Sequence, residues 1–212
     1  MISKRKSDGS IQSCRIHDLL RDLCMKEAER FNLYEVNVDG ASQNVKEGVR
    51  RLTIQNYDHT ALLRLPLYKG LRTLLDFAED STKLRSACEH LSVMRVLHLH
   101  VNYKVDDIAP SSPKNLILLR YLKVDRCYGT NLSDLLTIQH ISKLSNLQVL
   151  NLKSYGTISL PQGIWKLKLL RHINVIRHAT MPDARSSDDS FPHLQTISSI
   201  KYEEHTSNMA QQ

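Results

Sequence analysis

The chain has 212 residues, of which 41% are hydrophobic and 24% are charged, and this balance excludes an intrinsically disordered chain. No apolar run reaches the roughly 18 to 20 residues of a membrane span, and no signal-peptide segment follows the charged start, so we expect a cytoplasmic protein. The formal net charge is +7, but no block of five or more basic residues and no aromatic RNA-binding motif occurs, so nucleic-acid binding is not favoured.

Motifs for cofactor or metal chemistry are absent from the sequence. The four cysteines have no C-x-x-C spacing, which predicts reduced thiols rather than a zinc site or a disulfide framework. The seven glycines form neither common phosphate-binding loop, and no G-x-S-x-G or H-E-x-x-H arrangement occurs. We therefore expect that this chain is not an enzyme and that it binds no metal and no cofactor by itself.

Residues 1–36 are predicted to form a small N-terminal unit. Asp8-Gly9 is a turn pair between two short segments, which indicates a β-hairpin. A helix is predicted from about Ile16 to Arg30, and residues 37–48 are polar and form a linker. The helix has an apolar stripe with the spacing of an amphipathic helix: Ile16, Leu19, Leu20, Leu23, Cys24, Ala28 and Phe31.

An aliphatic L-x-x-L-x-L pattern recurs over residues 49–200. The middle aliphatic residue of each copy stands at 52, 74, 97, 122, 150, 173 and 197, and these intervals of 22 to 28 residues are typical of leucine-rich repeats. Five copies have all three aliphatic residues, whereas Asp76 and Ser199 take the third position in the other two. Leucine-rich helices would have to reproduce this period over six intervals by chance. We predict an α/β leucine-rich-repeat solenoid of about seven units with a curved parallel sheet, followed by a polar tail at 201–212.

The segments between the predicted strands repeat as well. Residues 141–147 and 164–170 share the pattern I-x-K-L-x-x-L at an offset of 23. This predicts a second aliphatic row on the return side of each unit. Cys127 falls at the position three beyond the last aliphatic, where such repeats favour Asn or Cys, and Asn102 takes the same position in another repeat.

The outward positions of the predicted strands form the candidate partner-binding surface, because the binding faces of solenoids lie on the concave side. His98 and His100 also have the spacing of a metal-binding pair, but no third ligand is identifiable. For each position a solvated surface residue is the alternative. The candidate partner-binding residues are His98, His100, Tyr121, Lys123, Asn151, Lys153, His172 and Asn174. The same alternation places Asp125, Val149 and Ile176 on this side.

The segment CRIHDLLRDLC at 14–24, followed by VRRLTI at 49–54 and by the L-P-x-x-I-x-x-L repeat at 160–167, resembles a known family. It is similar to plant nucleotide-binding leucine-rich-repeat disease-resistance proteins of the coiled-coil type, such as potato late-blight resistance proteins. The resemblance implies that residues 1–36 are the end of a winged-helix subdomain. It also implies that Ile16-His17-Asp18 stands for a Met-His-Asp motif, in which His17, supported by Asp18, faces the phosphates of ADP. A simple helix start is the alternative for these two residues.

The resemblance implies an interaction module of a cytoplasmic plant immune receptor, active in plant defence and the hypersensitive response. Its protein partner would be a pathogen effector or the nucleotide-binding module of a receptor. ADP or ATP would belong to the full-length family and not to this chain alone. Because the phosphate-binding module and further repeats are not in this sequence, we expect a truncated fragment. The alternative is a substrate-recognition subunit of a ubiquitin ligase, although an F-box needs about 40 residues of compact helices.

Overall fold

The protein is described from a computed structural model, which describes residues 2–5, 11–31, 35–37, 48–54, 68–77, 91–101, 116–126 and 138–201. Two strands, β1 (Ile2–Arg5) and β2 (Ile11–Cys14), pair antiparallel as the predicted hairpin. The helix α1 (Asp18–Arg30) follows. The predicted turn at Asp8-Gly9, most of the linker, Asn102, Cys127 and the tail from residue 202 lie outside the described residues.

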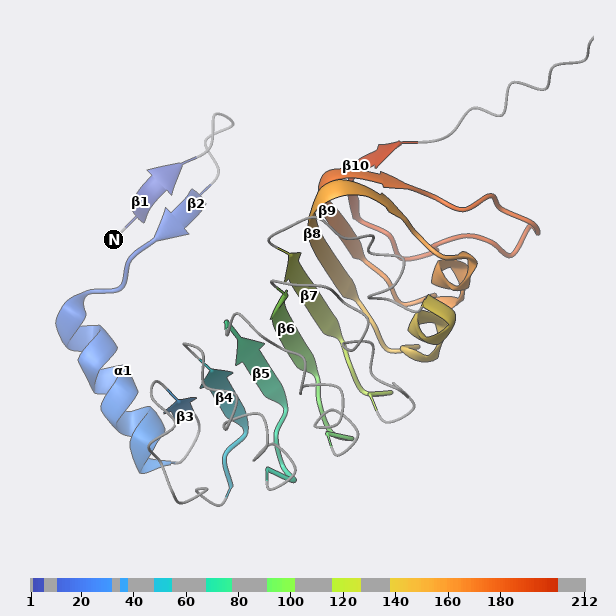
Figure 1. The fold of residues 1–212 in the computed structure, drawn as a ribbon. Coiled ribbons are helices and arrows are strands. Elements are labelled where there is room, and N and C mark those ends of the chain that lie inside the picture. The colour runs from blue at the N-terminus through green and yellow to red at the C-terminus, as the bar shows by residue number, and fades with distance from the viewer. Residues whose placement is uncertain are drawn as a thin grey trace, which may run out of the picture.

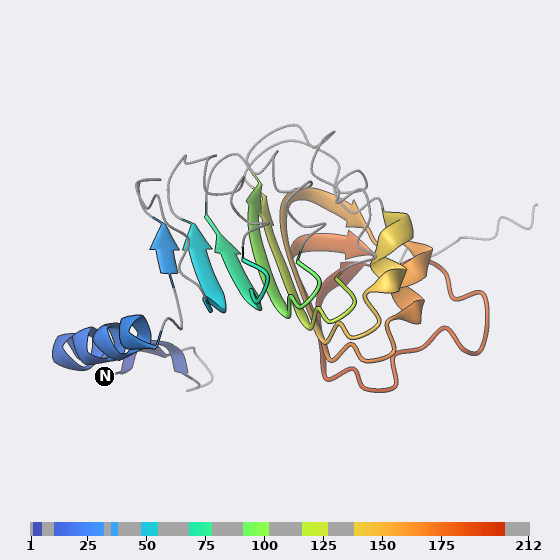
Figure 2. The same ribbon diagram turned by 90° about the horizontal axis from the view of Figure 1, so that it is seen from below.

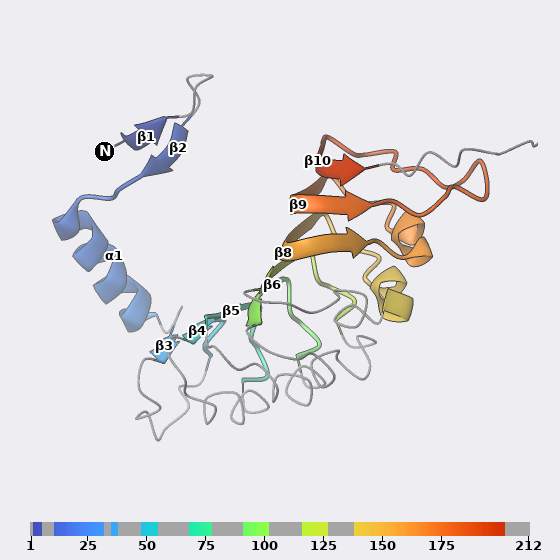
Figure 3. The same ribbon diagram turned by 45° about the horizontal axis from the view of Figure 1, so that its top comes forward.

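The rest of the described chain builds one curved parallel sheet, whose strands lie in sequence order (Figures 1 and 3). Each strand pairs with the next repeat's strand, which confirms the predicted solenoid architecture. Figure 2 shows the same strands from below, side by side along the curve. The strands are β3 (Glu35–Asn37), β4 (Arg51–Ile54), β5 (Thr73–Asp76), β6 (Val96–Val101), β7 (Tyr121–Arg126), β8 (Val149–Ser159), β9 (His172–Thr180) and β10 (Thr196–Lys201).

The sheet register follows the aliphatic repeat. The middle aliphatic residues of neighbouring repeats face each other across every strand pair from β4 to β10. These residues are buried from Leu52 to Ile173, whereas Ile197 on the last strand is 41% exposed. Asp76, which replaces an aliphatic residue in β5, is nevertheless fully buried. One shared core therefore runs along the solenoid, as expected when no unit buries its apolar face alone.

The return segments close this core from the other side. The two 3₁₀ helices η3 (Ile138–Lys143) and η4 (Gln162–Lys166), with the residue directly after each, carry the predicted second aliphatic row. Ile141 and Leu144 are buried in one unit, and Ile164 and Leu167 are buried in the next. The partly buried Trp165 stacks on Phe191 with ring centroids 4.8 Å apart. Short helical returns thus seal the core behind the strands.

Two features of the N-terminal region differ from the sequence predictions. The strand β3 crosses the predicted boundary between residues 36 and 37 and pairs in parallel with β4, so the sheet already begins at Glu35. This short strand contains Val36 as its one aliphatic residue, so it has no aliphatic repeat pattern. Its place in the sheet depends on its backbone pairing with β4. The helix begins at Asp18 instead of Ile16, because His17 is its N-cap.

The apolar stripe of α1 is exposed in the described structure. Leu19 is 75% exposed and Phe31 is 62% exposed, and no residue of the helix is buried. The amphipathic pattern thus predicts the helix, while the described residues do not bury its apolar face.

Candidate functional site on the concave face

Outward side chains of consecutive strands come into register on the face opposite the core. Because side chains alternate along a strand, every second residue of β6 to β9 lies on this face. Paired strand positions therefore form rows that run across the sheet. The first row is Val96, Tyr121, Val149, His172 and Thr196; the second is His98, Lys123, Asn151, Asn174 and Ser198; the third is His100, Asp125, Lys153 and Ile176.

A directional chain of amide hydrogen bonds crosses three strands. Asn174 Nδ2 donates to Asn151 Oδ1 at 2.7 Å, and Asn151 Nδ2 donates to Tyr121 Oη at 2.9 Å. Beside it, His172 Nδ1 lies 2.9 Å from Thr196 Oγ1. Because each amide already has a partner on the next strand, these half-buried side chains are held in place before any ligand arrives.

An ionic cluster lies next to the amide chain. Asp125 Oδ2 is 2.7 Å from Lys123 Nζ and 2.8 Å from His98 Nε2. The ring of Phe77 packs edge-on against His98, with centroids 4.8 Å apart. Together these neighbours leave His98 only 6% exposed. His98 was predicted to face a partner, but the structure buries it within the sheet surface instead.

A hollow of about 260 Å³ lies over β7, β8 and β9 on this face. Lys153 is exposed at its rim, and no hydrogen bond or ion pair ties it to another of the residues described. Ile176 adds an apolar surface that is 56% exposed. The lining consists of Lys123, Asp125, Asn151, Leu152, Lys153, Asn174 and Ile176.

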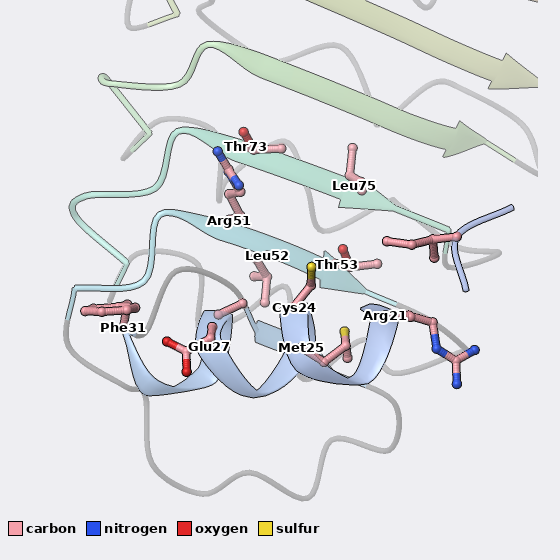
Figure 4. A pocket seen from close by; sticks show the side chains of 12 residues that line it. Arg21, Cys24, Met25, Glu27, Phe31, Arg51, Leu52, Thr53, Thr73 and Leu75 are labelled. Atoms are coloured by element: carbon pink, nitrogen blue, oxygen red, sulfur yellow. The ribbon is translucent and has the colours of Figure 1, made fainter. Parts of the chain in front are cut away.

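A second pocket, of about 770 Å³, lies between α1 and the first strands of the sheet (Figure 4). Cys24 points from the helix toward β4, and Phe31 lies at the end of the helix. Leu75 on β5 and Thr53 on β4 line the opposite wall. The lining is mostly apolar, and neither His17 nor Asp18 belongs to it.

His17 and Asp18, for which the resemblance implies contact with ADP, lie exposed at the start of α1. His17 Nδ1 accepts a hydrogen bond from the backbone N–H of Leu19 at 3.3 Å, as N-cap side chains do. The cap is therefore His17 rather than the carboxylate of Asp18, whose position in the first turn still favours the helix dipole. Their role toward a nucleotide stays a prediction.

Comparison with known proteins identifies the type of repeat. The family model described as a leucine-rich repeat region matches residues 70–212, which is more than half of the chain. The chain belongs to the leucine-rich-repeat family. It is 32% identical over 181 residues to the ToMV susceptible protein tm-2 of Solanum lycopersicum, a match that covers 81% of this chain and 20% of that protein.

The relatives of this leucine-rich-repeat chain are plant disease-resistance proteins, which confirms the resemblance found in the sequence. A putative late blight resistance protein homolog, R1B-8 of Solanum demissum, is 26% identical over 94% of this chain and 17% of its own length. The chain thus spans about a fifth of the curated relatives that it matches. Among solved structures, internalin C2 of Listeria monocytogenes matches with a TM-score of 0.46 and 20% identity, covering 73% of this chain and 61% of that one.

Among the described residues of this leucine-rich-repeat chain, no group of three or more His, Cys, Asp or Glu side chains could hold a metal ion. Similarly, no helix in the described ranges combines the length and apolar character that crossing a membrane requires.

The protonation states of the ionic cluster follow from its burial and hydrogen bonds. Burial lowers the pKa of His98, and the opposing hydrogen bond that His98 donates to Asp125 does not outweigh it. Burial alone would raise the pKa of Asp125, but hydrogen bonds from Lys123 and His98 lower it below the ordinary value of 3.8. At neutral pH the carboxylate is ionised and only accepts, so the neutral imidazole of His98 carries its proton on Nε2.

Mild acid is expected to destabilise the leucine-rich-repeat fold through His98. Because the pKa of folded His98 lies below its ordinary value of 6.5, the unfolded chain binds this proton first as the pH falls. The stability is therefore complete above about pH 6.5 and declines as the pH falls toward the pKa of folded His98. Asp125 acts in the same direction only below about pH 4. We expect the urea midpoint of the His98→Gln variant to change less between about pH 7.5 and 5.5 than that of the unchanged chain.

The exposed His193 provides the control for this measurement. The His193→Gln variant also loses one imidazole, but it should keep the pH dependence of the unchanged chain. A His98→Gln variant whose midpoint falls as steeply with acid as that of the His193→Gln variant would contradict the role given to His98.

Sequence analysis missed several residues of this face. Phe77 and Thr196 became partners of His98 and His172 only through strand pairing. No local pattern marks either contact. Asp125, by contrast, was placed on this face by the strand alternation, because it stands two positions after Lys123 on the same strand. Its role as the shared acceptor of His98 and Lys123 was not predicted.

Proposed function

We propose that this leucine-rich-repeat region is a protein-interaction module of a plant immune receptor and that its concave face binds the partner. The three rows of outward side chains around the 260 Å³ hollow carry this proposal. Leucine-rich repeats form an interaction fold without catalytic machinery, and several of the relatives are named as resistance proteins. The partner is a pathogen protein or a nucleotide-binding module. No observation favours a ubiquitin ligase.

The chemistry of the face supports a protein partner. The amide chain holds Asn151 and Asn174 rigidly, so a ligand that uses their remaining hydrogen-bonding positions meets prearranged groups. The exposed Ile176 offers apolar area next to Lys153. A mixture of aromatic, apolar and fixed polar groups is typical of the centre of protein interfaces. Of the predicted partner-binding residues, Tyr121, Asn151, Lys153 and Asn174 carry this proposal, while Lys123 and His98 mainly hold Asp125.

Site-specific crosslinking tests which face is used. A photoreactive amino acid would replace Lys153 on the concave face or the exposed Lys166 on η4, and the chain would be irradiated in leaf extract. We expect one defined protein to crosslink from position 153 and not from position 166. Crosslinks from position 166 alone, or equally from both positions, would place the interface on the return side.

Reversing the charge at Lys153 gives the corresponding affinity prediction. If the crosslinked partner is acidic, Lys153→Glu should lower its association rate about 3- to 10-fold at low salt, because an exposed charge near the interface steers the encounter. Lys166→Glu makes the same change of net charge on the return side. Because that side is separated from the concave face by about the Debye length of 8 Å or more, the association rate should change much less. Surface plasmon resonance at two salt concentrations measures both. Equal effects of the two substitutions would contradict the concave assignment.

A further inference from the structure

A row of arginines runs along one edge of the sheet, apart from the concave face. The position directly after the first aliphatic residue of each repeat is basic in five of seven repeats. Each of these positions stands just before a strand begins, on the lower edge of β4 to β7 in Figure 1. We call this row the arginine edge; it comprises Arg50, Arg72, Arg95, Arg120, Gln148, Arg171 and Gln195.

The backbone fixes the spacing of the arginine edge. The carbonyl oxygen of Arg50 accepts two backbone N–H groups of the next repeat, from Arg72 at 2.9 Å and Thr73 at 3.0 Å. The same double acceptance recurs at every step as far as Arg171, which accepts from Gln195 at 2.7 Å and Thr196 at 3.0 Å. The side chains are therefore carried at intervals of one strand separation, about 4.8 Å.

Most arginines of this edge are exposed in the described structure. Arg50, Arg95, Arg120 and Arg171 are exposed, and Arg72 is half-buried. Within the described ranges none of the five forms an ion pair with a carboxylate. The described turns that precede Arg72, Arg95 and Arg120 contain no Asp or Glu, so no neighbouring acid there lowers the positive potential.

Exposed apolar residues stand on a turn at the centre of the edge. Ile117 is 50% exposed and Leu118 is 40% exposed, on the turn that leads into Arg120. Asn146 Nδ2 donates to the carbonyl oxygen of Ile117 at 2.7 Å, which ties this turn to the next repeat. Arginine is enriched at protein interfaces, whose buried centre is more apolar than the rest of the surface.

We propose that the arginine edge binds an acidic amphipathic helix of a protein partner. One turn of an α-helix advances 5.4 Å, so carboxylates three or four residues apart lie about 5 to 6 Å from each other on one face. That spacing lies close to the step of about 4.8 Å between arginines. The long, flexible arginine side chains can compensate for the mismatch between the two spacings over three steps. Each guanidinium can hold a carboxylate through two parallel hydrogen bonds.

The apolar turn distinguishes this partner from a nucleic acid. A phosphate backbone would use the charges, but it has no aliphatic surface to place against Ile117 and Leu118. Single-stranded nucleic acids also need aromatic platforms for their bases. The one aromatic residue in the described turns before Arg72, Arg95 and Arg120 is Tyr68, which is buried. An amphipathic helix would pair its acidic side chains with the arginines and place its neighbouring apolar side chains against the turn.

Two peptides of equal composition test the proposal on the full chain. In the first peptide, of about 16 residues and stapled as a helix, glutamates recur every three to four residues on one face beside leucines; in the second they are scattered around the helix. We expect fluorescence anisotropy to show that the first peptide binds about 5- to 30-fold more tightly, with an affinity that falls with salt. Equal binding of the two peptides would overturn the proposal, and so would tighter binding of a single-stranded RNA, which would assign the edge to nucleic acid.

Matched substitutions locate the binding. Arg95→Gln with Arg120→Gln should weaken the first peptide about 5- to 30-fold, as expected for the loss of two charge pairs. Lys143→Gln with Lys166→Gln removes the same charge from the return side and should leave the affinity unchanged. A loss as large in this control would overturn the assignment to this edge, without bearing on the concave interface.

A gain of affinity provides a test that misfolding cannot imitate. Gln148 interrupts the row between Arg120 and Arg171, and it is half-buried on the same edge. Gln148→Arg would complete a run of six arginines. A peptide longer by two helical turns should then bind the Gln148→Arg variant at least about threefold more tightly than it binds the unchanged chain. No gain in affinity would contradict a partner that lies along the row.

Discussion

Replacing Leu150 with Asp is expected to destabilise the solenoid by about 3 to 5 kcal/mol. Leu150 is fully buried at the centre of the sheet, paired in register with Leu122 on one side and Ile173 on the other. A carboxylate there would stand in the shared core without a partner, and burying an unpaired charge is costly. Because each repeat contacts only its neighbours, the damage should spread to the units on both sides.

Urea unfolding followed by circular dichroism measures this effect. The Lys153→Asp variant is the matched control, because it places the same carboxylate on the same strand at an exposed position. This control should keep the midpoint close to that of the unchanged chain. A Leu150→Asp variant that unfolds at the same urea concentration as the control would show that Leu150 does not belong to a cooperative core.

Replacing Asp125 with Ala is expected to cost about 1 to 3 kcal/mol, although Asp125 lies on the sheet surface. The carboxylate accepts from both His98 and Lys123. Lys123, whose side chain is 33% exposed, can turn to solvent, but His98 cannot, because its side chain is only 7% exposed. The cost therefore arises mainly from an Nε2–H that is left buried without an acceptor.

A second substitution separates this cause from a general loss of packing. In the Asp125→Ala background, His98→Phe removes the orphaned donor and keeps a ring against Phe77, so it should recover part of the lost stability. Asp188→Ala, in an exposed loop, controls for the loss of a carboxylate. An Asp125→Ala variant as stable as the Asp188→Ala variant would contradict the account of the cluster.

The sequence by itself determined the architecture of the solenoid. The aliphatic period specified which residues face the core from Leu52 to Val175, because in a parallel stack each repeat aligns its leucines with those of the neighbouring repeat. The return rows at Ile141 and Ile164 were predictable from a repeated pattern, and the hairpin before α1 was predictable from its turn pair. The arginine edge was equally visible in the repeat, since an arginine follows the first aliphatic residue in five units, but a search for apolar periodicity passes over it.

Only the tertiary structure decided which outward residues are free to bind. His98 and Lys153 both lie at outward positions of their strands, yet His98 is buried by Phe77 and Asp125 while Lys153 is exposed. Those neighbours belong to other repeats, 21 residues before and 27 residues after His98. Likewise, β3 joins the sheet through hydrogen bonds to β4 rather than through any pattern of its own. The period of a repeat determines which face a side chain is on, whereas its exposure depends on the particular side chains that neighbouring strands place beside it.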